Sequence, residues 1–309
     1  MFCSFVLPAY KIDYFDKAIK SILNQSEDDW ELIIVDDASP DNLISVVERY
    51  KDSRIRFYRN QENIGGNNLV NQWNIALSYA QGDYVVLASD DDMYSKDYLK
   101  SLKKLVETYP SYNVYASRKI IIDENDNAID IDGSLGEELT LLDFATEMFR
   151  GRVYSSISNF MFSRETLIKI GGFVDFPLAW FSDDATVLKC ANKGIIFSSV
   201  PLFYFRFSGK NISSNKNLGM FYTKINSTIL FYKWGQKFMS SILVNSTKEE
   251  ILFRNIGRHF KDYLRYRTEL LIRDSDWKVF WQLYRKRRYM PFVNTRWLFK
   301  EFIKLIIKK

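Results

Sequence analysis

The chain has 309 residues, of which 47% are hydrophobic and 26% charged, and its net charge is +5. This composition is typical of an ordered globular protein with one large domain or two smaller ones. With a single histidine, His259, and two distant cysteines, Cys3 and Cys190, the chain has no disulfide framework, and it is not expected to use a Ser–His pair or a multi-histidine metal site.

Strands and helices alternate along the first 110 residues. Strands are expected at 3–10, 30–41, 54–60 and 83–92, and helices at 14–25, 43–51, 63–82 and 96–110. The first, second and fourth strands are continuous apolar runs rather than alternating ones. This pattern predicts an α/β fold with a mostly parallel sheet whose two faces are covered by helices.

The middle of the chain is more mixed, and its end is helical. A strand is expected at 114–123, a helix at 137–151, a strand and a helix within 155–173, a helix at 183–194 and a strand pair at 195–209. From about residue 213 the pattern is helical to the end. The sequence therefore predicts a domain over 1–210 and a helical C-terminal region over 211–309.

Three clusters of residues, two of them acidic, lie at the ends of three predicted strands. They are Pro8, Ala9 and Tyr10, then Asp36 and Asp37, and finally the triplet Asp90, Asp91 and Asp92. Because parallel strands bind ligands at their carboxyl ends, these residues are expected to meet at one rim of the sheet. Oxygen ligands without nearby histidine or cysteine suit Mg²⁺ or Mn²⁺ bridged to a phosphate ligand.

A glycine-rich stretch, "NIGGNN" at 63–68, precedes one of the predicted helices. It lacks the Lys-Ser/Thr ending of a phosphate-binding P-loop. Its backbone N–H groups, around Asn63 and Gly65, could still approach an anion. The alternative is a plain loop before a helix.

Five motifs follow one another within about residues 2–208: "FVLPAY", "ELIIVDDASPD", "NIGGNNLVNQWNIAL", "AQGDYVVLASDDDMY" and "FSDDATVLKCANKG". In order and spacing they resemble the motifs of family 2 inverting glycosyltransferases. The resemblance implies the glycosyltransferase-A fold, a Rossmann-like sheet flanked by helices, here with a helical extension. It also implies an enzyme of bacterial surface-polysaccharide assembly that takes a nucleotide-sugar donor.

The resemblance implies roles for the residues at the rim. Pro8, Ala9 and Tyr10 would lie against the base and ribose, and Asp36 or Asp37 would hydrogen-bond the base. The triplet of Asp90, Asp91 and Asp92 matches the family's D-x-D-like motif, with one carboxylate on the ribose and another on the metal ion. Arg206 lies where relatives often place a basic group near the diphosphate, and a structural role for it is the alternative.

The pair Asp183 and Asp184 matches the family's acidic pair, whose aspartate is the general base. Alignment of the motif on Gly194 assigns the general base to Asp183, whereas alignment on the acidic pair assigns it to Asp184. Both assignments stay open. The other interpretation is helix capping, because acids are favoured in the first turn of any helix by about 1 kcal/mol.

The last thirty residues are basic and amphipathic. Within 297–309, aromatic and aliphatic residues alternate with Lys300, Lys304, Lys308 and Lys309. Basic amphipathic helices of this kind typically lie on anionic membranes. We therefore expect residues 280–309 to contact such a membrane. An ordinary packed helix or a homodimer contact is the alternative. No nucleic-acid-binding module accompanies the basic run, so nucleic acid is not an expected partner.

The sequence thus predicts a Mn²⁺- or Mg²⁺-dependent transferase that moves a sugar from a nucleotide-diphosphate sugar, with UDP the commonest donor nucleotide in the family, to a saccharide or lipid-linked acceptor. The expected location is cytoplasmic, at the inner face of the plasma membrane, since neither a signal peptide nor a membrane-spanning run is apparent. A nucleotidyltransferase and a non-catalytic nucleotide-sugar-binding relative are the alternatives.

Overall fold

The computed structural model describes residues 3–153, 155–209, 217–244, 246–273, 275 and 279–307. Lys308 and Lys309 of the predicted basic surface lie outside these ranges. The chain forms two compact units: Met1–Phe144, Ser155–Asp175 and Ser182–Ser208 make unit 1, and Ala145–Tyr154, Phe176–Phe181 and Gly209–Lys309 make unit 2. Unit 2 thus includes two short segments that precede residue 210.

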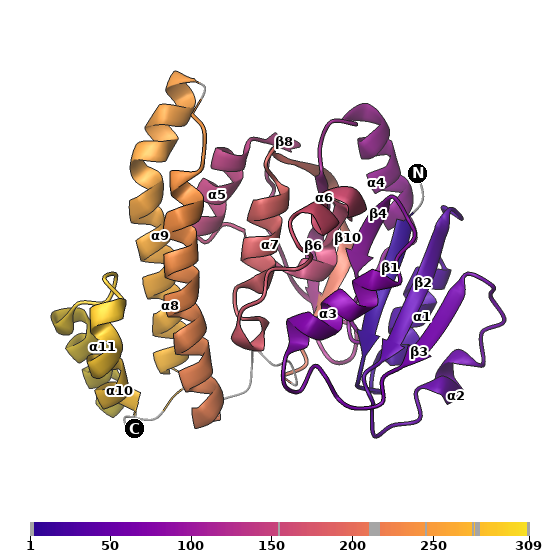
Figure 1. Ribbon diagram of the computed structural model, residues 1–309, viewed down its shortest axis with the longest axis horizontal. Helices are drawn as coiled ribbons and strands as arrows, with labels where there is room; N and C mark the ends of the chain where they lie inside the picture. Colours follow the sequence, from indigo (N-terminus) through magenta and orange to yellow (C-terminus); the bar gives the residue numbers. More distant parts are fainter. Residues whose placement is uncertain are drawn as a thin grey trace. The chain divides into compact units, whose positions relative to one another are not determined.

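A mixed sheet with the path β3-β2-β1-β4-β9-β6-β10-β5 forms the centre of unit 1. Its first four strands are parallel, and they lie side by side in Figure 1. They are β1 (Cys3–Ala9), β2 (Trp30–Asp36), β3 (Ile55–Arg59) and β4 (Tyr84–Leu87). Every residue of β2 is buried, which explains why its sequence is apolar without alternation.

The second half of the sheet introduces antiparallel pairs. Its strands are β5 (Met93–Tyr94), β6 (Val114–Ile122), β9 (Phe160–Ser163) and β10 (Ile195–Arg206), while β7 (Ala128–Ile131) pairs with β6 and β8 (Glu138–Leu139) with β10. Strand β9 runs antiparallel to both β4 and β6, so β6 is parallel to β4 again. The α/β fold with a mostly parallel first half agrees with the prediction.

Helix α1 (Phe15–Leu23) of unit 1 buries one apolar stripe. Its buried residues are Phe15, Ala18, Ile19 and Ile22, at the spacing of a single helix face. The remaining helices are α2 (Ile44–Val47), α3 (Leu69–Ser78), α4 (Tyr98–Thr108), α5 (Leu141–Phe149), α6 (Arg164–Lys169) and α7 (Ser182–Cys190). Helix α5 lies at the boundary, with its last residues in unit 2.

Three local predictions differ from the structure. The helix expected over 43–51 has only one turn, Ile44–Val47. The expected strand pair over 195–209 is one long strand, β10, with irregular register between Ser198 and Phe203, where Pro201 cannot donate to the ladder. The helix expected from residue 137 begins at Leu141, because Glu138 and Leu139 pair with β10.

Unit 2 is built mainly from long helices. They are α8 (Leu218–Ser240), α9 (Thr247–Arg273), α10 (Val279–Lys286) and α11 (Thr295–Ile307). Its core is aromatic: Phe231 stacks on Phe181 with ring centroids 4.5 Å apart, and Phe149 lies 4.8 Å from Phe260. A Cβ on Gly235 would lie 2.3 Å from the Phe260 ring, so α8 and α9 approach closely there. No described helix has the length and apolarity needed to cross a bilayer.

Candidate functional site

The ends of β1, β2 and β4 meet at one rim of the sheet, as predicted. Ala9 pairs with Asp36 in the parallel register, and the backbone N–H of Asp37 donates to the carbonyl of Ala9 at 2.9 Å. The backbone N–H of Tyr10 donates to the Asp90 carboxylate at 2.9 Å. Three segments that are distant in sequence therefore form one surface, on which the Tyr10 side chain is 42% exposed.

Asp36 is fully buried at the end of β2. One carboxylate oxygen accepts the backbone N–H of Ser39 at 2.8 Å, and the other is paired with the guanidinium of Arg59. Ala38 adopts φ 52°, a left-handed conformation that is strained for a residue with a Cβ. The side chain of Asp36 thus closes the tight turn that carries Asp37.

Asp37 holds the glycine-rich loop. Its carboxylate accepts the backbone N–H groups of Ile64 at 2.9 Å and Gly65 at 2.7 Å, and the side-chain amide of Asn60 at 2.7 Å. The N–H of Gly65 is therefore directed at Asp37, and the Asn63 side chain likewise accepts the N–H of Gly66. Sequence reasoning identified these donors but not their internal acceptor.

The acidic triplet lies in the loop between β4 and β5. Asp90 accepts the N–H groups of Tyr10 and Lys11 on one oxygen, at 2.9 and 2.7 Å. Asp92 is buried; one of its oxygens accepts the N–H of Arg206 at 2.9 Å and the other the Ser89 hydroxyl at 2.7 Å. Asp91 lies between them and is half-buried.

Burial and like charge act together on this loop. Burial first, and the negative charge of Asp91 second, raise the pKa of Asp90 to about 6, although the N–H groups that it accepts act in the opposite direction. The same two causes raise the pKa of Asp92 to about 8. Three neighbouring carboxylates destabilise the fold unless a positive charge offsets their repulsion. Such a cluster is expected where a cation binds.

Arg206, at the end of β10, is fully buried. Its guanidinium donates to the backbone carbonyls of Asp91 at 2.8 Å and Asp123 at 2.9 Å, pairs with Asp126 at 2.6 Å and stacks 4.2 Å from the Tyr14 ring. These contacts support the structural alternative, in which Arg206 fixes the acidic loop. Contact with a diphosphate stays a prediction.

Asp183 and Asp184 occupy the first turn of α7, where negative charge complements the helix dipole. They differ in exposure: Asp184 is 2% exposed, whereas Asp183 is half-buried. Within α7, every residue except Asp183 and the outward-facing Lys189 is buried. Asp183 is therefore the more exposed member of the pair, and its role as the general base stays a prediction.

Lys119, in the middle of β6, was not identified from the sequence. It is buried, and its backbone N–H donates to the Asp132 carboxylate at 3.1 Å. Burial lowers the pKa of its ammonium group, and the negative charges of Asp132, Asp183, Asp92 and Asp184 act in the opposite direction. A lysine inside an apolar strand, "RKIII", was the available signal.

The side chains at this rim offer oxygen ligands, which are the ligands that hard divalent cations prefer. Among the described residues, no group of three or more His, Cys, Asp or Glu side chains is arranged as a complete metal site. Mg²⁺ and Mn²⁺ commonly take one or two protein carboxylates and obtain further ligands from phosphates and water. Both oxygens of Asp92 accept hydrogen bonds, and one oxygen of Asp90 accepts two. Metal binding by Asp90, Asp91 or Asp92 stays a prediction.

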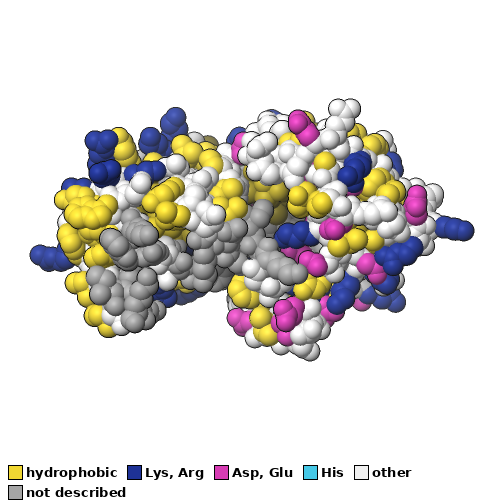
Figure 2. Space-filling model, turned by 90° about the horizontal axis from the view of Figure 1, so that it is seen from below, with side chains coloured by type: hydrophobic (Ala, Val, Ile, Leu, Met, Phe, Trp, Pro, Cys, Tyr) yellow, Lys and Arg dark blue, Asp and Glu magenta, His cyan; other side chains and the backbone are white. Residues whose placement is uncertain are grey.

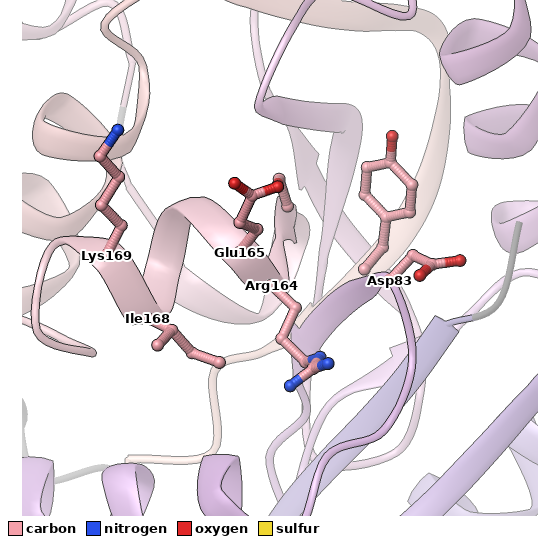
Figure 3. Close-up of a pocket in the computed structure, with 7 residues that line it drawn as sticks. Asp83, Arg164, Glu165, Ile168 and Lys169 are labelled. Carbon is pink, nitrogen blue, oxygen red and sulfur yellow. The ribbon is translucent and has the colours of Figure 1, made fainter.

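A surface cavity of about 760 Å³ lies at the other end of β4 (Figure 3). It is lined by Asp83, Tyr84, Ser163, Arg164, Glu165, Ile168 and Lys169. The cavity lies at the start of β4, whereas Asp90 follows the far end of the same strand. None of the predicted site residues lines this cavity, and its mixed charges select no ligand class.

Comparison with known proteins gives the family. The family model described as glycosyl transferase family 2 matches residues 4–173, which contain β1 to β4 and the acidic triplet. The chain belongs to glycosyl transferase family 2. The match ends before α7, so Asp183 and Asp184 lie outside it.

Two relatives are matched over part of their length. TuaG of Bacillus subtilis, named for teichuronic acid biosynthesis, is 38% identical over 108 residues, 34% of this chain and 42% of TuaG. WfgD of Escherichia coli, named as a UDP-Glc:α-D-GlcNAc-diphosphoundecaprenol β-1,3-glucosyltransferase, is 30% identical over 128 residues, 41% of this chain and 48% of WfgD. The chain thus aligns with less than half of either protein.

Two solved structures share the fold. TarS of S. aureus in complex with UDP-GlcNAc has a TM-score of 0.60 at 18% identity, covering 94% of this chain and 88% of that one. The mannosyltransferase PcManGT of Pyrobaculum calidifontis in complex with GDP-Man and Mn²⁺ has a TM-score of 0.55 at 18% identity, covering 88% and 72%. The glycosyltransferase-A fold predicted from the sequence is confirmed.

Proposed function

We propose that this protein is an inverting glycosyltransferase of bacterial polysaccharide biosynthesis. It moves a sugar from a nucleotide-diphosphate sugar to a hydroxyl group of a saccharide or lipid-linked acceptor. The observation that carries the proposal is the convergence of the acidic triplet with the ends of β1 and β2, in a chain of family 2. TarS with UDP-GlcNAc, and the UDP-Glc and diphosphoundecaprenol in the name of WfgD, favour UDP and a lipid-linked acceptor.

The nucleoside would lie on the exposed Tyr10 ring, beside Pro8 and Ala9. Two hydrogen bonds fix the backbone of Tyr10: its N–H donates to the Asp90 carboxylate, and its carbonyl accepts the Ser39 hydroxyl at 2.6 Å. Asp36 and Asp37 shape this surface through their internal hydrogen bonds. An N–H group of the base that donates to Asp37 would have to share the oxygens that now accept the loop N–H groups.

The diphosphate would lie over the triplet. Asp91 with Asp90 would hold Mn²⁺ or Mg²⁺, and the bound ion supplies charge neutralisation for the leaving nucleoside diphosphate. Asp92 and Arg206 support this loop from behind. An oxygen of Asp90 would then make the ribose contact that is expected of the triplet.

We assign the general base to Asp183. The acceptor hydroxyl attacks the anomeric carbon as the bond to the diphosphate oxygen breaks, and its proton passes to the Asp183 carboxylate. Attack from the face opposite the leaving group inverts the anomeric centre. Asp183 is the accessible acid of the pair, and Asp184 is enclosed.

Unit 2 offers a surface for an anionic membrane at which a lipid-linked acceptor would lie. On α11, Phe299, Ile303 and Ile307 form an exposed stripe at i, i+4 spacing, and Arg296, Lys300 and Lys304 form a second one beside it. On α10, Trp281 is 60% exposed. Among the coloured side chains, the unit 2 part of Figure 2 shows Lys and Arg beside hydrophobic groups and no acidic ones.

Titration with nucleotides tests the proposed function. UDP, GDP and dTDP are each added with Mn²⁺ and with EDTA to the wild type, Asp91→Asn and Asp130→Asn, the last an exposed acid of β7 that serves as control. We expect one nucleotide to bind with Mn²⁺ and binding to weaken at least tenfold in Asp91→Asn alone. Failure of folded wild-type protein to bind any of the three would contradict the proposal.

A further inference from the structure

The turn that joins β6 to β7 is fixed by one of its own side chains. The Asp123 carboxylate accepts the backbone N–H groups of Asn125 at 2.8 Å and Asn127 at 2.9 Å, and the side-chain amide of Asn127 at 3.0 Å. Within this turn Asp126 adopts φ 70°, a left-handed conformation that aspartate tolerates better than most residues with a Cβ. The turn therefore gives Asp126 a defined position.

Asp126 forms ion pairs with two cations that are distant in sequence. One carboxylate oxygen lies 2.6 Å from the guanidinium of Arg206, and the other lies 2.6 Å from the ammonium of Lys17 on α1. The Arg206 side chain is fully buried, whereas the Lys17 side chain is 45% exposed. Because a buried charge is costly without a partner, the pair with Arg206 is the one that constrains the structure.

Arg206 extends this connection to the acidic loop, residues 88–92 between β4 and β5. Its Nε donates to the carbonyl of Asp91 at 2.8 Å, and its backbone N–H donates to the Asp92 carboxylate at 2.9 Å. The Nη1 atom that pairs with Asp126 also donates to the carbonyl of Asp123 at 2.9 Å. Since a guanidinium group is planar, its N–H groups hold the turn and the acidic loop in one mutual geometry.

We propose that Asp126 and Arg206 are positioning residues for the divalent cation: their ion pair fixes the backbone at Asp91 and thereby sets the affinity of the acidic loop for Mn²⁺ with nucleotide. This inference rests on the proposed function, because it takes the acidic loop as the place where the cation binds. Neither residue has to touch the cation or the diphosphate. The β6–β7 turn, which lies outside all five sequence motifs, becomes part of the donor site.

The physical reason is the strict geometry that small divalent cations require. Mg²⁺ prefers near-ideal octahedral coordination, so a carboxylate ligand has to be held at a defined position. The direction of the Asp91 side chain depends on the orientation of its own peptide group, whose carbonyl accepts from Arg206. Loss of the groups that orient a metal ligand typically lowers metal affinity by about 10- to 100-fold.

Two substitutions of opposite charge separate positioning from a simple effect of charge. Asp126→Asn removes a negative charge and retains a residue type that tolerates left-handed φ, whereas Arg206→Met removes a positive charge. Charge alone would weaken cation binding in the first variant and strengthen it in the second. Positioning predicts about tenfold weaker binding in both. The double variant should bind no more weakly than the weaker single variant, because the two residues act as one unit.

The affinity is measured by titration with Mn²⁺, with the free ion followed by EPR, at a saturating concentration of the nucleotide that wild-type protein binds. Calorimetric affinity for that nucleotide in EDTA should change less than threefold. Hydrogen exchange of a peptide spanning 88–94 in metal-free protein supplies a readout without the ion, and exchange should be faster in both variants. Asp130→Asn is the control, since Asp130 is an exposed acid of the same hairpin, and it should leave all three measurements unchanged.

Unchanged Mn²⁺ affinity in folded Asp126→Asn, or tighter Mn²⁺ binding in Arg206→Met, would overturn the inference. An equal loss of nucleotide affinity in EDTA would place Arg206 on the diphosphate and would also overturn it. Should Arg206→Met not fold, Arg206→Lys keeps the charge without the planar group: positioning still predicts weaker Mn²⁺ binding, and charge alone predicts no change. Failure of the proposed function is distinguishable, because wild-type protein itself would then bind no nucleotide with Mn²⁺, and the inference would fall with it.

Discussion

The carboxylate of Asp90 ties the loop after β4 to Tyr10, whose backbone N–H donates to it at 2.9 Å. The same oxygen accepts the N–H of Lys11 at 2.7 Å. One acid of the triplet thus shapes the nucleoside surface, besides its proposed contact with the nucleotide.

Two substitutions at Asp90 separate these roles. Asp90→Asn keeps an oxygen acceptor and should lower stability little, yet weaken nucleotide binding with Mn²⁺ at least tenfold. Asp90→Ala removes the acceptor and should cost about 1 kcal/mol more, because two N–H groups lose their partner in a partly exposed site. Urea unfolding and nucleotide titration measure the two effects; equal stability of both variants would contradict the linking role.

The raised pKa of Asp92, about 8, predicts a stability that depends on pH. A carboxyl whose folded pKa lies above its unfolded value holds its proton more tightly when folded, so metal-free protein should lose stability as pH rises from about 4 to 8. Mn²⁺ should reduce this loss. Thermal unfolding at pH 5.5 and 8.5, with and without Mn²⁺, checks both statements.

Asp92→Asn is the variant that isolates this effect. It should be less sensitive to pH over the same range than wild type, because the neutral amide has no proton to lose. Asp130→Asn, which alters an exposed acid, should retain the wild-type dependence. A pH profile shared by all three proteins would show that Asp92 is not responsible.

Asp183 and Asp184 should respond differently to amidation. Asp183→Asn is expected to lower kcat by about 10²- to 10⁴-fold, the usual contribution of a general base, with nucleotide affinity unchanged. Asp184→Asn should act mainly on stability, since the side chain is enclosed at the start of α7. Transfer assays beside thermal unfolding compare them, and a larger kcat loss in Asp184→Asn would reverse the assignment.

Gly65 has no space for a side chain. A Cβ there would lie 2.8 Å from the Asp37 carboxylate that accepts the Gly65 N–H. Gly65→Ala should displace the loop and weaken nucleotide binding, at a stability cost of about 1–3 kcal/mol. Gly133→Ala is the matched control, because nothing lies within 4 Å of its Cβ position.

The α10–α11 surface predicts binding to acidic vesicles. Sedimentation with phosphatidylglycerol-containing vesicles should retain wild-type protein, and retention should fall several-fold in Trp281→Ser/Ile303→Glu. Ile129→Glu, at an exposed residue of β7 in unit 1, is the control. Retention that is equal on neutral vesicles, or concentration-dependent dimerisation lost in the double variant, would contradict the lipid assignment.

Local patterns account for much of the fold. The apolar runs of β1, β2 and β4 are continuous because both faces of these strands are covered. The acids that follow them lie at one rim because the strands are parallel and end at the same edge of the sheet. Helix α2 was overestimated and β8 was missed, since a one-turn helix and a two-residue strand depend on their tertiary neighbours.

By itself the sequence determined the order of elements, the family motifs and the residue types of the site, because periodicity and spacing are local properties. Only the tertiary structure decided what each side chain contacts. It directs the Gly65 N–H to Asp37, encloses Arg206 behind the triplet and leaves Asp183 rather than Asp184 accessible. It also buries Lys119, whose pKa responds to acids from three segments, because burial and charge at one point depend on elements that are distant in sequence.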